Sequence, residues 1–174
     1  GGSHTRRSQR NPTDTEKLIH QGAADGIIYI KGVKHVPESG KTYSQQIAEI
    51  STKLKLSDIY HRTIENAKIF MLDCLGCILS GSQIINAKVI RKTAQEISGE
   101  GSCTIFGTGA KVNPMMAALV NGTAGHSQDS DDDHREGTQH ASVAVLPAVL
   151  ALAEKYGKSG AEVLLAYIVG SDVT

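Results

Sequence analysis

The sequence predicts a mainly α-helical fold with a bundle-like helical core. Apolar residues recur at three- and four-residue spacing through most of the chain after residue 43, and the extended stretches between them are short. The 174 residues, 40% of them apolar, are enough for one domain with a hydrophobic core.

The first 42 residues are expected to lie outside this helical domain, which we place at residues 43–174. Gly1 to His4 begin without a methionine and resemble a tag scar. Residues 5–42 are poorly patterned and read as a tail or linker, with residues 27–30 as a candidate short strand.

The domain is predicted to open with two helices. Residues 43–54 carry isoleucine and leucine side chains that share one helical face. A second helix is expected to follow a cap at Ser57 or Asp58 and to end at Gly81. Because this second helix is apolar on most faces, we expect it to lie deep in the core.

A third helix is expected over residues 85–97, stopped by Gly99. Residues 103–106 form a short extended piece. Asn113 and Pro114 then supply an N-cap and a first-turn residue, which predicts the start of a fourth helix.

Two further helices complete the expected domain. The fifth covers residues 142–156 and ends at Gly157. Ser159 and Glu162 form a capping box for the sixth, which reaches Thr174 without a stop signal. The domain is therefore expected to continue past the last residue.

Composition excludes several classes of protein. Acidic and basic residues number 18 each, so the chain lacks the basic excess of a nucleic-acid binder. Asp73 and Gly170 interrupt the longest apolar runs before the roughly 18 residues of a membrane span. Three cysteines and a polar N-terminus predict a reducing compartment, either the cytoplasm or, in a eukaryote, the mitochondrial matrix.

Cys74 and Cys77 have the C-x-x-C spacing of redox motifs. They lie inside an apolar helical run, whereas a redox pair needs a strand–helix setting and an exposed first cysteine. We predict that both are small core residues, and that Cys103 is too.

The chemistry is expected in residues 126–140, which hold four aspartates and three histidines. The segment interrupts the helical pattern between the fourth and fifth helices, where the chain must turn. Loops held by rigid helices are where functional residues concentrate. The segment is therefore the candidate site.

Calcium binding is the first interpretation of this segment. Asp129, Asp131 and Asp133 have the spacing of the first three ligands in a helix–loop–helix calcium site. The glycine required at the sixth position is His134, and the glutamate required at the twelfth is His140. The spacing therefore disfavours calcium.

Three interpretations stay open on residue types alone. Histidine and aspartate suit a transition metal, although the spacing is no recognised ligand pattern and adjacent aspartates cannot all face one ion. Histidine and crowded carboxylates also suit acid–base catalysis. The third interpretation is a solvated acidic loop.

Residues 121–134 resemble the MmgE/PrpD family, whose pattern there is N-G-x-x-x-H-x-x-D-(F/Y)-D-D-T-H. The family's H-P-S and V-L-P-A segments are similar to residues 140–142 and 145–148. Further similarity covers residues 67–81, 104–119 and 165–170, so that the resemblance spans about residues 44–174.

The resemblance implies the N-terminal portion of a large helical domain, with the family's smaller α+β lid domain absent. It implies a usual homodimer and a reaction without metal or organic cofactor. The family's active-site aspartate falls on Asp129 and its histidine on His140. Its second aspartate pair falls on Asp131 and Asp132, and its second histidine on His134.

The chain departs from the family pattern at three positions. Asp133 replaces a threonine, Ala141 replaces the proline of H-P-S, and Ser130 replaces an aromatic residue. An extra carboxylate at Asp133 would repel an anionic substrate, and Arg135 is the only nearby base. The family's lysines and further histidine would fall beyond Thr174.

These observations predict a lyase that acts on a small polycarboxylate by acid–base catalysis. Dehydration is favoured, as in 2-methylcitrate dehydratase, with decarboxylation of cis-aconitate or epimerisation of iminodisuccinate as alternatives and an inert helical subunit as an alternative of another class. Asp129 and His140 are expected to handle protons. Asp132, Asp133 and His134 are expected to bind or orient the substrate.

Overall fold

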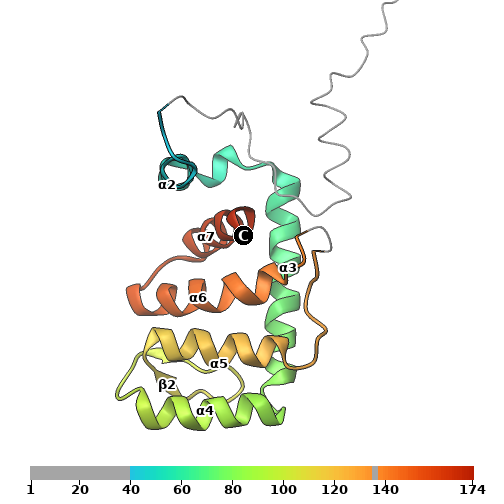
Figure 1. Ribbon diagram of the computed structural model, residues 1–174, viewed down its shortest axis with the longest axis vertical. Helices are drawn as coiled ribbons and strands as arrows, with labels where there is room; N and C mark the ends of the chain where they lie inside the picture. Colours follow the sequence, from blue (N-terminus) through green and yellow to red (C-terminus); the bar gives the residue numbers. More distant parts are fainter. Residues whose placement is uncertain (1–39, 135–136) are drawn as a thin grey trace, which may run out of the picture.

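The computed structural model describes residues 40–134 and 137–174, and in them the chain is mainly helical (Figure 1). The predicted fold class is therefore confirmed. The candidate strand at residues 27–30 lies outside the described residues. The elements in order are α2 (Tyr43–Lys53), the 3-10 helix η1 (Leu56–Asp58), α3 (His61–Gly81), α4 (Ile85–Ile97), β1 (Cys103–Thr104), β2 (Lys111–Val112), α5 (Pro114–His126), α6 (Ala141–Tyr156) and α7 (Gly160–Val173).

Helix α5 is the centre of the arrangement, because it packs against α3, α4 and α6. Helices α4, α5 and α6 lie in a row, and α3 runs across their ends (Figure 1). An 86° bend between α3 and α4 produces this crossing. Helix α7 packs on α6 and α3. The described part of the loop between α5 and α6 lies beside α3 (Figure 1).

Two apolar clusters fill the interior on either side of α5. The first joins α3, α5, α6 and α7 around Ile78, Leu146 and Ile168, whose side chains are fully buried. The second joins α4, the β-hairpin and α5 around Val112 and Val120. Burial on both sides of α5 fixes its position relative to the other helices.

Helices approach α5 closely where a glycine removes a side chain. A Cβ atom added at Gly81 of α3 would lie 1.8 Å from the backbone oxygen of Ala124. One added at Gly125 would lie 2.6 Å from Cγ2 of Val143 on α6 and 3.2 Å from Cγ1 of Ile78 on α3. Glycine at 81 and 125 therefore sets the spacing of α3, α5 and α6.

A two-stranded antiparallel hairpin joins α4 to α5, with Cys103 opposite Val112. Asn121, buried in α5, accepts a hydrogen bond from the backbone N–H of Phe106 at 3.0 Å and donates one to the carbonyl of Thr104 at 2.9 Å. Residues 103–106 were predicted to be extended. The second strand was not predicted, because two residues carry too little pattern to be recognised.

Most predicted helix ends are confirmed. Asn113 caps α5 through a hydrogen bond from the N–H of Met116. Gly157 takes the left-handed conformation at the end of α6, and Ser159 and Glu162 form the capping box of α7. The sequence alone therefore defined the start of α5, the end of α6 and the start of α7.

The predicted start of the second helix is wrong. Ser57 and Asp58 belong to η1, and the carboxylate of Asp58 accepts a hydrogen bond from the backbone N–H of Lys55 at 3.0 Å. Helix α3 begins at His61, and its N-cap Tyr60 makes no side-chain cap. Asp58 is engaged one turn too early to cap α3.

The expectation that this helix lies deep in the core holds for only one of its faces in the described part of the chain, where Cys74 and Ile78 are buried. Ile69 is 64% exposed and Leu72 is 72% exposed, because α5, α6 and α7 pack against only one side of α3.

Among the described residues, no helix by itself has the length and apolar character to cross a membrane. Helices α3 and α4 together meet these criteria across their bend.

The contact between Gly81 and Ala124 predicts the effect of a single methyl group. Gly81→Ala should lower the free energy of unfolding by about 1–3 kcal/mol, because backbone atoms block the new Cβ. Urea unfolding followed by circular dichroism measures this change.

Gly76→Ala is the matched control in the same helix. A Cβ at Gly76 meets no atom within 4 Å, so this change should raise the free energy of unfolding by up to about 1 kcal/mol through helix propensity. Equal unfolding midpoints for the two variants would contradict the proposed close approach.

Candidate active site

The two ends of the loop at residues 127–140 carry histidines. His126 is the last residue of α5, and His140 is the N-cap residue of α6. Their rings meet edge to face, with centroids 4.7 Å apart and planes at 63°. The close packing of α5 on α6 at Gly125 and Val143 brings these two ends together.

The loop is held against α3 near its start. The hydroxyl of Ser80 donates a hydrogen bond to Oε1 of Gln128 at 2.7 Å. The Cys77 thiol donates a weak hydrogen bond to the carbonyl oxygen of Ser130 at 3.7 Å. These contacts place the following residue, Asp131, between the two histidines.

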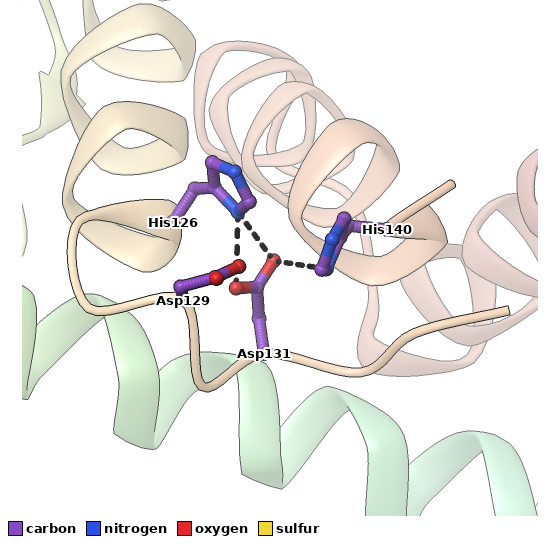
Figure 2. Close-up of side chains that lie close together, drawn as sticks. All are labelled: His126, Asp129, Asp131 and His140. Atoms are coloured by element: carbon purple, nitrogen blue, oxygen red, sulfur yellow. Dashed lines mark hydrogen bonds and ion pairs between the residues drawn. The ribbon is translucent and has the colours of Figure 1, made fainter. Parts of the chain in front are cut away.

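Asp131 lies between the two histidine rings, and its side chain is fully buried (Figure 2). Nδ1 of His126 lies 3.1 Å from both carboxylate oxygens of Asp131. Nδ1 of His140 lies 3.3 Å from Oδ2 of the same carboxylate. The His126 side chain is 51% exposed and that of His140 is 32% exposed, so solvent reaches the imidazoles but not the carboxylate.

The carboxylate fixes the orientation of the rings. A carboxylate only accepts hydrogen bonds, so Nδ1 of His126 must carry the proton in its contact with Asp131. The contact of His140 Nδ1 with Asp131 is not aligned as a hydrogen bond, although proximity to the charge favours the same tautomer. In this arrangement Nε2 of each ring has the free lone pair.

Asp129 lies on the solvent side of the cluster. It has a left-handed backbone conformation, with φ of 52°, which is uncommon for a residue other than glycine. Its carboxylate and one atom each from His126, Asp131 and His140 all lie within 4.8 Å of one another (Figure 2). The structure therefore brings together the two residues predicted to handle protons, Asp129 and His140.

The three other predicted site residues lie outside this four-residue cluster. The half-buried Asp132 is near the Cys74 thiol and the Tyr167 hydroxyl, and its Oδ1 atom is buried without a hydrogen-bond partner in the described residues. Asp133 is exposed to solvent. His134 pairs with Gln139 across a turn, and its Nδ1 accepts a hydrogen bond from the N–H of Gly137 at 2.9 Å.

A buried pair of hydroxyl groups joins α6 to α7. The hydroxyls of Ser142 on α6 and Tyr167 on α7 are hydrogen-bonded at 2.5 Å.

Burial raises the pKa of Tyr167, and burial together with the nearby carboxylate of Asp132 raises the pKa of the Cys74 thiol to about 12. Cys74, Cys77 and Cys103 are all buried, which confirms their prediction as core residues.

Sequence reasoning did not assign roles to His126 and Asp131, which complete the cluster. For Asp131, the signal was its place in the second aspartate pair of the family pattern. For His126, the signal was its position as the last residue before the loop.

The cluster can perform two kinds of chemistry. Imidazoles oriented by a buried carboxylate can give and accept protons at Nε2, with Asp129 as a second proton-handling group. Two imidazoles and two carboxylates within 4.8 Å could also hold a metal ion.

Most of the chain is similar to proteins of one known family. Residues 45–174 match the MmgE/PrpD N-terminal domain. Similar curated proteins include the cis-aconitate decarboxylases of Homo sapiens, 34% identical over 138 residues, and of Aspergillus terreus, 33% identical over 138 residues. The cis-aconitate decarboxylase-like protein oryM of Aspergillus oryzae is 32% identical over 126 residues. These alignments cover 68–76% of this chain but only 26–28% of each relative.

The buried carboxylate predicts the tautomers of both histidines. In their neutral form, His126 and His140 should carry the proton on Nδ1, and Asp131→Asn should shift both toward the Nε2-protonated form because the charge is removed. Nitrogen-15 NMR of the imidazole rings distinguishes the two forms.

The exposed His61, whose side chain is 89% exposed, serves as an internal reference for these spectra. Its tautomer ratio should be the same in both proteins. If the signals of His126 and His140 were unchanged by Asp131→Asn, Asp131 would not orient the rings.

The raised pKa of Cys74 predicts that its thiol is inert. Iodoacetamide at neutral pH should leave Cys74 unmodified in the native protein and alkylate it after unfolding in urea. Peptide mass spectrometry measures both rates, and equal rates would contradict the buried position of Cys74.

Proposed function

Because the chain belongs to the MmgE/PrpD family, we propose that it contributes the acid–base groups of a lyase acting on a small polycarboxylate. The observation that carries this proposal is the convergence of His126, Asp129 and His140 around the buried carboxylate of Asp131. The chain spans about a quarter of the length of these relatives, at 26–28%.

Decarboxylation of a cis-aconitate-like substrate is the reaction that the named relatives favour. The bond between a carboxylate carbon and its neighbour breaks, carbon dioxide leaves, and the electron pair remains on the substrate. A proton from the His140 imidazolium then completes the product, so the substrate exchanges carbon dioxide for one proton. His140 regains its proton from water.

Asp131 supports this role of His140. The buried carboxylate lies 3.3 Å from Nδ1 and so holds the imidazole ring in one orientation. It also keeps Nε2 directed away from the carboxylate. His140 is 32% exposed, which leaves its ring accessible to a small molecule.

Dehydration, which the sequence pattern favoured, uses the same pair of groups. One of Asp129 and His140 accepts a carbon-bound proton, and the other protonates the departing hydroxyl group, which leaves as water. Atoms of the two side chains lie within 4.8 Å of each other, so both groups can reach neighbouring carbons of one small substrate. Neither reaction needs a metal or organic cofactor, and a homodimer of the whole enzyme is part of the proposal.

The experiment is an assay of the protein in the full length that its gene encodes. Cis-aconitate, 2-methylcitrate, citrate and iminodisuccinate are the substrates, and NMR of the products distinguishes decarboxylation, dehydration and epimerisation. Turnover of cis-aconitate with release of carbon dioxide is the expected result. No turnover of any of the four would contradict the proposal and favour the inert helical subunit.

His140→Ala should lower kcat by about 10²- to 10⁴-fold, the usual contribution of a general acid or base. Asp129→Asn should also lower kcat, because asparagine tolerates the left-handed backbone but cannot take up the proton. Both variants are compared with wild type in steady-state assays.

His61→Ala is the control, since His61 lies at the exposed start of α3, where it pairs with Glu65. It should keep the wild-type kcat. If His140→Ala retained kcat within a few-fold of wild type, His140 would not be a proton-handling residue.

A further inference from the structure

The first turn of α6, which begins directly after His140, has few restraints of its own. His140 is the N-cap residue but makes no side-chain cap, and its carbonyl accepts a hydrogen bond from the N–H of Ala144 at 3.3 Å. Pro147 removes a further bond of this turn, because it has no N–H to donate to the carbonyl of Val143. A helix end with so few local bonds opens readily. The position of His140 therefore depends on contacts with other helices.

A hydroxyl group of α7 supplies such a contact. The hydroxyls of Tyr167 and Ser142 are hydrogen-bonded at 2.5 Å, and Ser142 follows His140 by two residues. Both residues are buried, with Tyr167 2% exposed and Ser142 0% exposed. A hydrogen bond that is shielded from water is electrostatically stronger than one at the surface. This bond therefore ties the first turn of α6 to α7.

Helix α7 is a rigid partner for this bond. It packs beside α6 (Figure 1), and a Cβ atom added at Gly170 would lie 2.6 Å from Cγ1 of Val145. Leu164 and Ile168, which precede and follow Tyr167 on α7, are buried in the first apolar cluster. Close packing of this kind leaves a side chain little freedom to move. The phenol ring of Tyr167 is therefore held in place independently of α6.

The hydroxyl of Tyr167 is suited to holding a position and not to transferring a proton. Burial raises the pKa of Tyr167, and the nearby carboxylate of Asp132 adds to this effect, although the hydrogen bond to Ser142 opposes it. The phenol therefore stays neutral near pH 7. Asp132, which the sequence assigned to substrate, instead lies beside this buried hydroxyl.

We infer that Tyr167 and Ser142 are positioning residues for His140. Their hydrogen bond fixes the first turn of α6, and this turn holds Nδ1 of His140 3.3 Å from Oδ2 of Asp131. Without the bond, the ring would move away from the carboxylate, and Nε2 would lose its fixed direction. The effect on catalysis rests on the proposed lyase function, whereas the effect on the ring does not.

The first test measures the His140 ring without substrate. Tyr167→Phe removes the hydroxyl and keeps the aromatic ring. Nitrogen-15 NMR should then show a smaller share of the Nδ1-protonated tautomer at His140, because its ring moves away from Asp131. The exposed His61 is the internal reference and should not change. Tyr156→Phe removes the same atom from an exposed tyrosine of α6, so this matched control should leave His140 unchanged.

A second variant removes the same hydrogen bond from the α6 side. Ser142→Ala should change the tautomers of His140 as Tyr167→Phe does. The double variant should show no larger change than either single variant, because all three lose one and the same bond. Ile105→Val, in the second apolar cluster, lowers stability without touching the bond and should leave His140 unchanged. Circular dichroism checks the fold of each protein.

The second test measures turnover of the full-length protein. Tyr167→Phe and Ser142→Ala should each lower kcat by about 10- to 10²-fold, the effect of a small displacement of a reacting group. KM should stay within a few-fold of wild type, because neither hydroxyl contacts the substrate in this proposal. Tyr156→Phe and Ile105→Val should keep the wild-type kcat.

Unchanged tautomers of His140 in either folded variant, Tyr167→Phe or Ser142→Ala, would overturn the inference. An equal change in Ile105→Val would also overturn it, since lower stability alone would then be the cause. Changed tautomers with wild-type kcat would refute the catalytic part. If the wild-type protein turned over none of the four substrates, the lyase proposal would fail, and the NMR result would still decide whether Tyr167 positions the ring.

Discussion

The close contact between α5 and α6 at Gly125 is the constraint on which the site depends. Val143 occupies the space that a side chain at position 125 would fill, and Ile78 of α3 lies against the same glycine. His126 follows Gly125 directly, and His140 precedes Val143 by one helical turn. The packing that closes the core therefore also sets the distance between the two imidazoles.

Several residues of the family pattern serve this framework rather than the chemistry. Asn121 joins α5 to the hairpin, and Ser142 joins α6 to Tyr167 of α7. Pro147 lies inside α6 and has no N–H to donate to the carbonyl oxygen of Val143. Gly122 of α5 packs near this same oxygen. The proton-handling side chains are few, and these structural residues position the helices that carry them.

The helices could be predicted from sequence because capping residues and apolar spacing act locally. Asn113, Gly157 and Ser159 define helix ends by interactions within a few residues. The burial of α3 could not be predicted in this way, because it depends on which helices pack against it. Similarly, the sequence could not predict that Asp131 rather than Asp132 contacts the two histidines. This depends on the loop backbone, including the left-handed conformation at Asp129.

The pairing of His134 with Gln139 separates the loop into two parts. Residues before His134 are fixed by α3 and the histidine cluster, whereas Gly137 and Thr138, the described positions between the paired residues, belong to neither. Insertions or deletions there would leave Asp131 and His140 in place. Evolution can therefore vary the length and charge of the segment between His134 and Gln139 without changing the contacts that hold Asp131 between His126 and His140.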